Sequence, residues 1–402
     1  MTTANPHITD SPPLSKTALI MIEVALAMGG FGIGIGEFAT MGLMPSLASG
    51  LGVSEPMVGH LISVYALGVV IGAPLLAVIG SRLYRRNFLL GLMSFYALTN
   101  IASALAPGFE SLLAFRFVSG LPHGTYFGVA ALVVASIAPP GQRGKAVSRV
   151  MIGLTLAILI GNPLATWLGQ SISWRYAFAL VAVVSMLTIA LIFIFVPLDR
   201  NQLRNRPLGE LKAFNRPEVW LALMIGATGF AGVFAVFSYL AATLLNVTGV
   251  SKGWIPVAMM VFGMGGFVGT LAGGWLFDKF QFKSVGGALV WSLVVFLLYP
   301  SATGELWSLL LLTFMVGTVA ALSAPLQTHL MDVATGAETL AAASHHAAFN
   351  TANALGPFLG GLAISAGLGW SSTGYVGAAT ALVGLGFFLW AWQWERAKSR
   401  KE

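Results

Sequence analysis

The sequence predicts an all-α membrane protein whose twelve transmembrane helices form two pseudo-symmetric six-helix bundles, with both termini in the cytoplasm. Three observations lead to this fold class. The 402 residues are 57% hydrophobic and only 9% charged, whereas soluble domains carry about 25% charged residues. Apolar runs of membrane-crossing length follow one another along the chain, and a short pattern of its first half recurs in its second. Helices are the expected form because lipid offers no partner for an open sheet edge.

The apolar runs between charged or turn-forming breaks give the twelve expected spans. They cover residues 18–46, 57–80, 88–106, 110–138, 147–169, 175–197, 217–245, 254–277, 285–303, 305–332, 339–367 and 371–394. Residues 1–17 precede them as a polar cytoplasmic tail. The apolar run behind this tail is too long for the core of a signal peptide, so we expect a retained first helix.

The distribution of Lys and Arg predicts the orientation, because cytoplasmic loops are enriched in both residues. With the N-terminus inside, the expected inner loops and the tail at 395–402 hold most of the 21 basic residues. The outer loops keep Arg175 and Lys252, and Arg116 lies within a span. An even number of spans also places both termini on one side of the membrane.

A hydrophilic linker at 198–216 divides the spans into an N-terminal bundle, 18–197, and a C-terminal bundle, 217–394. An internal repeat supports this division. At a constant offset of 197 residues, Gly52-Val53-Ser54, Gly68, Gly72, Arg82 and Arg86 correspond to Gly249-Val250-Ser251, Gly265, Gly269, Lys279 and Lys283. Parallel repeats of this kind occur in transporters, with the substrate site between the halves.

Glu37 is an acid deep within the first span, in the glycine-rich stretch FGIGIGEFATMGLMP. A charge at this depth costs several kcal/mol or more and commonly marks an ion or proton path. Burial disfavours the charged form of a carboxyl, so small changes around it can load or release a proton. A hydrogen-bonded structural carboxyl is the alternative. Glu23, near the inner end of the same span, is expected to reach interfacial water.

Arg116 is the expected counter-charge of Glu37. At 1.5 Å per residue, Arg116 lies about 9–10 Å and Glu37 about 13 Å below the outer ends of their spans. Pairing, directly or through water, and snorkelling of Arg116 to the interface are both open. Gly120, Gly124 and Gly128 follow at steps of four, a spacing that lets another helix approach closely. His123 is expected to be a hydrogen-bonded packing residue.

Polar and aromatic residues of the second half suggest a substrate cavity rather than a proton relay. Its candidate residues are Phe234, Tyr239, Gln327, His345, His346 and Asn350. Packing against lipid is the alternative for the aromatic side chains. Zero cysteines exclude disulfides and thiolate chemistry. No Walker loop, GxSxG elbow or HExxH motif is present, so the sequence predicts neither an enzyme nor a metal site or cofactor.

The chain resembles the bacterial drug:proton antiporter branch of the major facilitator superfamily, and within it the arabinose- and purine-type efflux group. The resemblance rests on GEFATMGLMPSLASGLGVS, YALGVVIGAPLLA with SRLYRR, FRFVSGLPHGTYFG, GNPLATWLGQSISWRYAF and FNTANALGPFLGG. It implies the major facilitator fold. It also implies that Glu37 occupies the position at which this group keeps an acidic residue in its first helix. Arg116 and Gly120 match an arginine-and-glycine motif associated with proton coupling.

The resemblance also implies gating residues. Arg82 and Arg86 belong to the first inner-loop motif, where Ala77, Ser81 and Tyr84 replace its usual Gly, Asp and Gly. The second copy keeps Gly274, Asp278 and Lys279. The antiporter motif of the fifth helix is altered to Asn162-Pro163, whereas its counterpart in the eleventh is intact as Gly356, Pro357, Gly360 and Gly361. Gly124 and Pro163 are further conformational candidates.

The sequence thus predicts a monomeric secondary transporter of the bacterial inner membrane, driven by the proton gradient. It is expected to export a drug, sugar or purine by alternating access. Its expected partners are this small molecule, protons and membrane lipid, and no nucleic acid. A proton symporter or uniporter for sugars or nucleosides is the nearer alternative. A membrane receptor without transport is the other.

Overall fold

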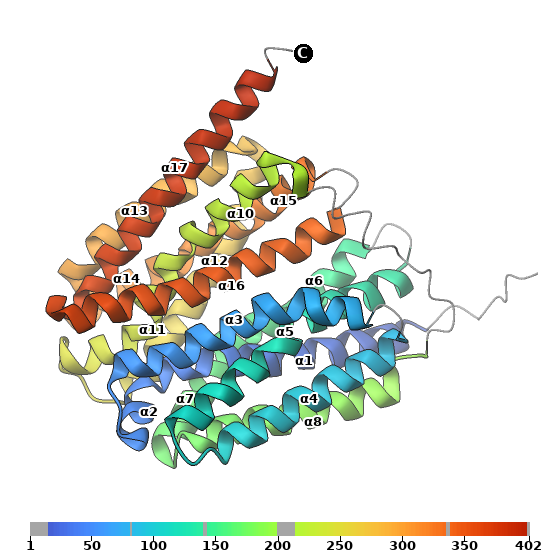
Figure 1. Ribbon diagram of the computed structural model, residues 1–402, viewed down its shortest axis with the longest axis horizontal. Helices are drawn as coiled ribbons and strands as arrows, with labels where there is room; N and C mark the ends of the chain where they lie inside the picture. The colour runs from blue at the N-terminus through green and yellow to red at the C-terminus, as the bar shows by residue number, and fades with distance from the viewer. Residues whose placement is uncertain (1–14, 81–82, 140–142, 199–213, 335–337, 400–402) are drawn as a thin grey trace, which may run out of the picture.

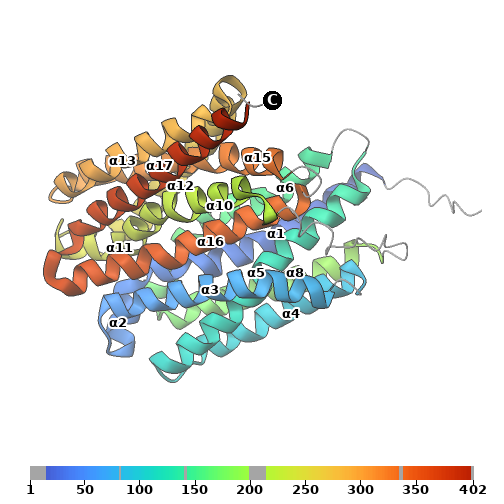
Figure 2. The ribbon, with the colours of Figure 1, turned by 45° about the horizontal axis from the view of Figure 1, so that its top comes forward.

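The computed structural model describes residues 15–80, 83–139, 143–198, 214–334 and 338–399. Every regular element within these ranges is a helix. In Figures 1 and 2 most of the blue-to-green helices of the first half lie below most of the yellow-to-red helices of the second. The prediction of an all-α protein is therefore confirmed.

The helices begin and end within a few residues of the predicted spans. The first half contains α1 (Lys16–Gly42), α2 (Met44–Leu51), α3 (Glu55–Gly80), α4 (Arg85–Ala104), α5 (Phe109–Ile137), α6 (Arg143–Leu156), η1 (Ala157–Gly161), α7 (Asn162–Ser171) and α8 (Arg175–Phe195). The second contains α10 (Pro217–Gly229), α11 (Ala231–Asn246), α12 (Trp254–Phe280), α13 (Lys283–Ala302), α14 (Leu306–Thr318), η3 (Val319–Leu322), α15 (Ser323–Val333), α16 (Glu338–Ala363), η4 (Ile364–Leu368), η5 (Trp370–Ser372) and α17 (Thr373–Ser399).

Eleven helices in the described ranges are long and apolar enough to cross a membrane. α16 is absent from this set although it has 26 residues. Its composition explains the difference, since His345, His346, Asn350 and Asn353 lower its hydropathy. α16 packs against α3 and α11, so these polar residues need not face lipid. The count of twelve spans and the cytoplasmic termini stay predictions.

Several helices are interrupted near a proline. α1 ends at Gly42 and α2 begins at Met44, with Pro45 in its first turn. The π-helical turn η1 comes directly before Asn162-Pro163, and the 3₁₀ turn η3 comes shortly before Pro325. Proline removes a backbone donor and its ring crowds the preceding turn. Wider or tighter turns accommodate this without breaking the span.

Glycines bring the same pairs of helices together in both halves. A Cβ atom added at Gly68 would lie 2.2 Å from the carbonyl oxygen of Phe117, and one at Gly265 would lie 2.1 Å from that of Phe314. Conversely, a Cβ at Gly120 or Gly317 would lie 2.1 Å or 2.3 Å from a backbone oxygen of α3 or α12. These contacts are also related by the offset of 197 residues. The α3–α5 and α12–α14 pairs therefore pack backbone against backbone in one register.

The repeat extends to the turns at one end of the bundle. Gly52 and Gly249 both adopt positive φ, at 67° and 71°. Glycine suits this left-handed conformation because it has no Cβ. Both turns lie at the end predicted to face outward, on the left of Figure 1 where α2 and α11 lie.

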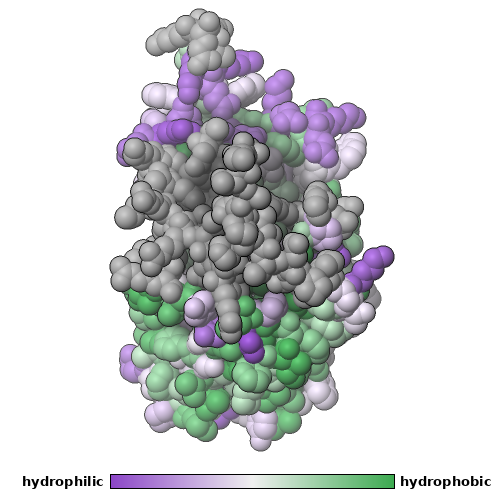
Figure 3. Space-filling view, turned by 90° about the vertical axis from the view of Figure 1, so that its right-hand side faces the viewer, coloured by the Kyte–Doolittle hydropathy of each residue, from purple (hydrophilic) through white to green (hydrophobic). Residues whose placement is uncertain are grey.

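The outer surface of the bundle is suited to lipid. Large apolar side chains are exposed along the helices, including Leu98 of α4, Ile194 of α8, Leu271 of α12 and Leu382 of α17. Figure 3 views the opposite end, where α1 begins, and shows hydrophilic side chains gathered in its upper part. This is the end that the Lys and Arg pattern predicts to face the cytoplasm.

The two halves contact each other toward the predicted outer end, through α3 and α16. The Ser63 hydroxyl donates to the carbonyl of Ala354 at 2.8 Å. A Cβ atom added at Gly59 would lie 2.4 Å from the Tyr239 hydroxyl, and one at Gly361 would lie 3.7 Å from the Pro56 ring. Small residues on both helices therefore permit a close approach between the halves.

Gly120→Ala and its repeat counterpart Gly317→Ala should both lower the melting temperature of the protein in detergent. The added methyl would meet backbone rather than a flexible side chain, and overpacking of this kind typically costs about 1–3 kcal/mol. Gly128→Ala is the matched control on α5, because no atom of another described helix lies within 4 Å of its added Cβ. An equal loss of stability in all three variants would contradict the shared backbone packing.

Candidate functional site: a buried carboxylate between the halves

Glu37 lies in the middle of the bundle, with 1% of its surface exposed. α1 brings it there because its residues from Gly29 to Gly42 are almost all buried. Its glycines make room for neighbouring helices: a Cβ at Gly36 would lie 2.1 Å from the Tyr96 hydroxyl, and one at Gly34 would lie 2.6 Å from the Ala157 methyl. The carboxylate is therefore held within protein rather than exposed to lipid.

The carboxylate of Glu37 connects the two halves. The side-chain amide of Asn353, on α16, donates to its Oε1 at 2.9 Å. Its Oε2 lies 4.0 Å from Nε2 of His123 on α5. One carboxylate therefore contacts a side chain of its own half and a side chain of the other half.

Arg116 lies beside Glu37 and is fully buried, so it does not snorkel to the interface. Its Nη1 donates at 2.8 Å to the carbonyl of Gly36, the residue before Glu37. Its guanidinium carbon lies 4.1 Å from the ring centroid of Tyr65, a cation–π arrangement. Within the described chain, no Arg116–Glu37 ion pair at 4.0 Å or less is present.

A hydrogen-bonded row of side chains extends from this centre. The Tyr65 hydroxyl lies 3.0 Å from Nδ1 of His123 and 3.3 Å from the Tyr96 hydroxyl. The Tyr96 hydroxyl in turn donates to the carbonyl of Ile33 at 3.4 Å. His123 therefore has one ring nitrogen on a tyrosine and the other near the carboxylate. Its role as a hydrogen-bonded residue is as expected, but it also adjoins Glu37.

Several buried polar atoms around Glu37 have no partner among the described residues. They are Nε and Nη2 of Arg116, Oδ1 of Asn353 and the hydroxyl of Thr40. Buried polar groups normally form hydrogen bonds, and leaving them unsatisfied costs about 1–3 kcal/mol each. This centre therefore has donors and acceptors that a transported molecule or water can use.

A second cluster lies on the side of the C-terminal half. Phe349 packs edge-on against Phe230 and Phe234, with ring centroids 5.3 Å and 4.9 Å away. The Nε2 of His345 lies 3.2 Å from the Ser323 hydroxyl. His346 stacks on Phe127 of α5 at 6.4 Å, a further contact between the halves. The predicted residues Phe234, His345 and His346 are thus brought together.

The other predicted cavity residues have separate positions. Asn350 donates from Nδ2 to the carbonyl of His346 at 3.0 Å, and its Oδ1 is among the unpartnered buried atoms. Gln327 is half-buried on α15. Tyr239 lies in the contact between the halves, where its hydroxyl donates to the carbonyl of Pro357 at 2.8 Å.

The residues predicted to act in gating fall into packed and exposed groups. Gly120 and Gly124 face α3, whereas Gly128 is exposed, so the close packing expected for it is not found. Gly356 packs against the backbone of Ala231. Pro163 occupies the first turn of α7.

The charged gating candidates lie at the predicted cytoplasmic end. Arg86 donates to the carbonyl of Phe193 and covers its ring. Asp278 and Lys279 are exposed at the end of α12, with the Lys279 ammonium 5.1 Å from the Trp275 ring, and Gly274 has open space beside it. Arg82 lies outside the described residues.

Sequence reasoning missed three members of the central site. Tyr65 and Tyr96 carry no charge and stand in ordinary apolar runs. Asn353 stands one helical turn after the predicted residue Asn350, and its partner Glu37 is 316 positions away. The sequence signal for Asn353 is that an uncharged polar residue stands within an apolar span. The identity of its partner depends on how the two halves meet.

Comparison with known proteins gives the family. Residues 26–344 match the profile of the Major Facilitator Superfamily. The chain is similar to the inner membrane transport protein YdhP of Escherichia coli, with 36% identity over 89% of this chain and 92% of YdhP. It is also similar to the transporter AraJ of Escherichia coli, with 35% identity over 90% of this chain and 92% of AraJ. A chloramphenicol resistance protein of Streptomyces lividans is 33% identical over 83% of this chain and 86% of that protein.

Solved structures show the same fold at lower identity. A mutant of the nucleoside transporter NupG superposes with a TM-score of 0.74 at 13% identity, over 93% of this chain and 99% of that one. A D-xylose-proton symporter superposes with a TM-score of 0.70 at 17% identity, over 93% of this chain and 96% of that one. The predicted resemblance and the predicted multi-pass location in the bacterial inner membrane are confirmed. The chain belongs to the major facilitator superfamily of membrane transporters.

Proposed function

We propose that this transporter exports a small molecule in exchange for protons, with Glu37 as the proton-binding group. One observation carries the proposal: the buried carboxylate of Glu37 is hydrogen-bonded across the two halves by Asn353. A proton gained or lost at this atom changes an interaction that holds the halves together. Proton binding and conformational change therefore share one contact.

Protonation weakens the bridge in a defined way. An ionised carboxylate accepts a charge-assisted hydrogen bond, which contributes about 1.5–3 kcal/mol. Protonated Glu37 accepts only a neutral hydrogen bond from Asn353 and loses its attraction to Arg116. The halves are then freer to separate at this depth. A change of about 1.4 kcal/mol shifts a two-state equilibrium tenfold.

Substrate binds, in this proposal, between Glu37 and the aromatic cluster of the second half. Phe127 and His346 meet across the halves, so a molecule lodged there contacts both. The unpartnered Nη2 of Arg116 and Oδ1 of Asn350 supply a donor and an acceptor, and Phe230 and Phe349 supply apolar walls. This mixed lining suits an amphiphilic molecule, the class to which chloramphenicol, named in one relative, belongs.

Glu37→Gln should retain substrate binding and lose proton-coupled transport in proteoliposomes. The amide keeps the shape and can still accept from Asn353, but it does not ionise. The measurement is substrate accumulation under an imposed pH gradient, with lumenal pH followed in parallel. Glu23→Gln is the matched control on α1. Glu23 lies away from the cluster and forms an ion pair with Arg149, whose Nη1 is 3.4 Å from its Oε2.

The direction of the pH change tests exchange against symport. Export in exchange for protons moves substrate and protons in opposite directions, whereas a symporter moves them together. Gradient-driven transport by Glu37→Gln at the wild-type rate would remove Glu37 from the mechanism. Counterflow without any proton movement in the wild-type protein would instead indicate a uniporter.

Asn353→Leu should increase the separation of the halves at the predicted outer end. The change removes the donor to Glu37 and keeps the number and branching of the side-chain heavy atoms. The chain has no cysteine, so Ser49→Cys and Ser365→Cys give one spin-label pair across the halves. In double electron–electron resonance, the ratio of the population at the longer label distance to that at the shorter one should rise at least about fivefold.

Asn350→Leu is the control for this experiment, because its amide donates to the carbonyl of His346 on its own helix. It should leave the distance distribution unchanged. Identical distributions for Asn353→Leu and the wild-type protein would show that the hydrogen bond to Glu37 does not hold the halves together.

A further inference from the structure

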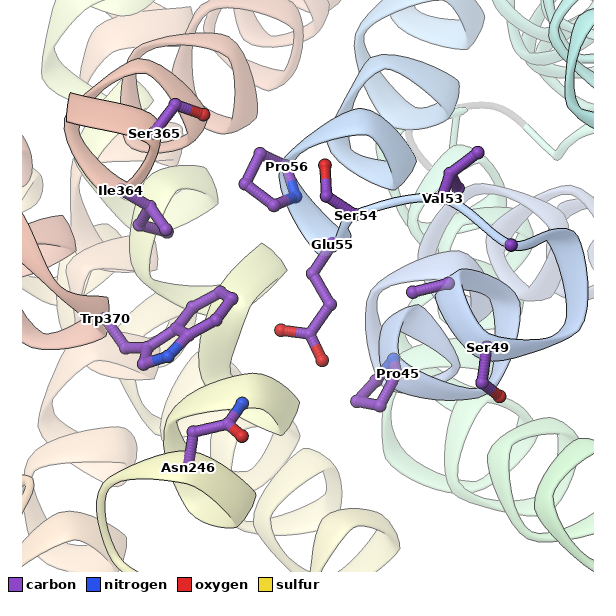
Figure 4. A pocket seen from close by; sticks show the side chains of 12 residues that line it. Pro45, Ser49, Val53, Ser54, Glu55, Pro56, Asn246, Ile364, Ser365 and Trp370 are labelled. Carbon is purple, nitrogen blue, oxygen red and sulfur yellow. The ribbon is translucent and has the colours of Figure 1, made fainter. Parts of the chain in front are cut away.

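A pocket of about 810 Å³ lies between the halves at the predicted outer end, away from Glu37. The first half lines it with α2 and the start of α3, from Pro45 to Pro56. The second half contributes Asn246 at the end of α11, Ile364 and Ser365 of η4, and Trp370 of η5. Figure 4 shows the Glu55 carboxylate pointing between Trp370, Asn246 and Pro45.

The charge of this pocket is one-sided. Glu55 is its single charged lining residue, and the described lining contains neither Lys nor Arg. The Oε2 atom of Glu55 is buried and has no hydrogen-bond partner among the residues that the structure describes. Glu55 is the first residue of α3, where the helix dipole offsets about half a charge. The remaining negative charge is available to a cation.

The walls around Glu55 favour an organic cation over a metal ion. Trp370 provides a large aromatic face, and Pro45, Pro56 and Ile364 are apolar. Aromatic faces attract cations, most strongly when the ring is Trp. A calcium ion would require six to eight oxygen ligands, whereas this pocket offers one carboxylate, one amide and scattered hydroxyls.

We propose that this pocket, the outer vestibule, binds an organic cation whose charge meets the Glu55 carboxylate and whose apolar groups lie on Trp370. The site is separate from the Glu37 centre and does not rest on the proposed proton coupling. Since its two main contacts come from different halves, a bound cation favours the arrangement in which the halves meet at this end.

The test is equilibrium dialysis of the purified full-length protein against tetraphenylphosphonium, with triphenylphosphine oxide as an uncharged probe of similar bulk. The wild-type protein should bind the cation at least about tenfold more tightly than the neutral probe. Glu55→Gln should weaken cation binding about tenfold. Trp370→Leu, which leaves the carboxylate intact on the opposite half, should weaken it about threefold to fivefold.

Matched controls separate this site from general charge effects and from the central site. Glu110→Gln removes an exposed acid at the start of α5, outside the pocket, and should leave the affinity unchanged. Glu37→Gln leaves every lining residue of the outer vestibule in place, so it should weaken cation binding less than Glu55→Gln does. Equal affinity for both probes, or wild-type affinity in both Glu55→Gln and Trp370→Leu, would overturn the proposal. Loss of binding in Glu37→Gln together with wild-type affinity in Glu55→Gln would place the cation in the central site instead.

Discussion

A carboxylate buried between two halves of a membrane protein constrains everything around it. An uncompensated charge there costs several kcal/mol, so Glu37 must be held by dipoles and counter-charges that other helices bring to it. Asn353, His123 and Arg116 come from α16 and α5. The glycines of α1 allow this crowding, because side chains at Gly34 or Gly36 would collide with neighbouring helices. The glycines around Glu37 are therefore needed for the same reason as its partners, because they let the neighbouring helices come close enough to stabilise the buried carboxylate.

The packing within each half differs in kind from the packing between them. Within the halves, glycines place helix backbones in direct contact, as Gly68 with Phe117 and Gly265 with Phe314. Such contacts have little freedom to rearrange, because no flexible side chain separates the two helix backbones. Between the halves, several contacts are single hydrogen bonds, such as Ser63 to Ala354 and Asn353 to Glu37. Relative motion of two stiff bodies is the movement that this distribution permits.

The fold was largely predictable from the sequence because its signals are local. Apolar run lengths and breaks gave the helices to within a few residues, and the repeat at 197 residues anticipated the paired contacts at Gly68 and Gly265. The site was predictable only in part. Glu37 and Arg116 stand out as charges in apolar spans, and similar depths placed them near each other. Asn353 could not be assigned to Glu37, because that contact depends on how α1 and α16 meet across the halves. The polarity of α16 also brought it below the hydropathy typical of a span.

The polarity of α16 follows from what the helix connects. Along its length lie His345 and His346 in the aromatic cluster, Asn353 on Glu37, and Pro357 as acceptor for Tyr239. Directly after it, η4 supplies Ile364 and Ser365 to the outer vestibule. A tilt of this one helix would therefore change the cluster, the carboxylate and the vestibule together. A more apolar α16 would cross a membrane more favourably but would have no donor for Glu37. Its histidines and asparagines are tolerated because α3 and α11 shield the helix from lipid.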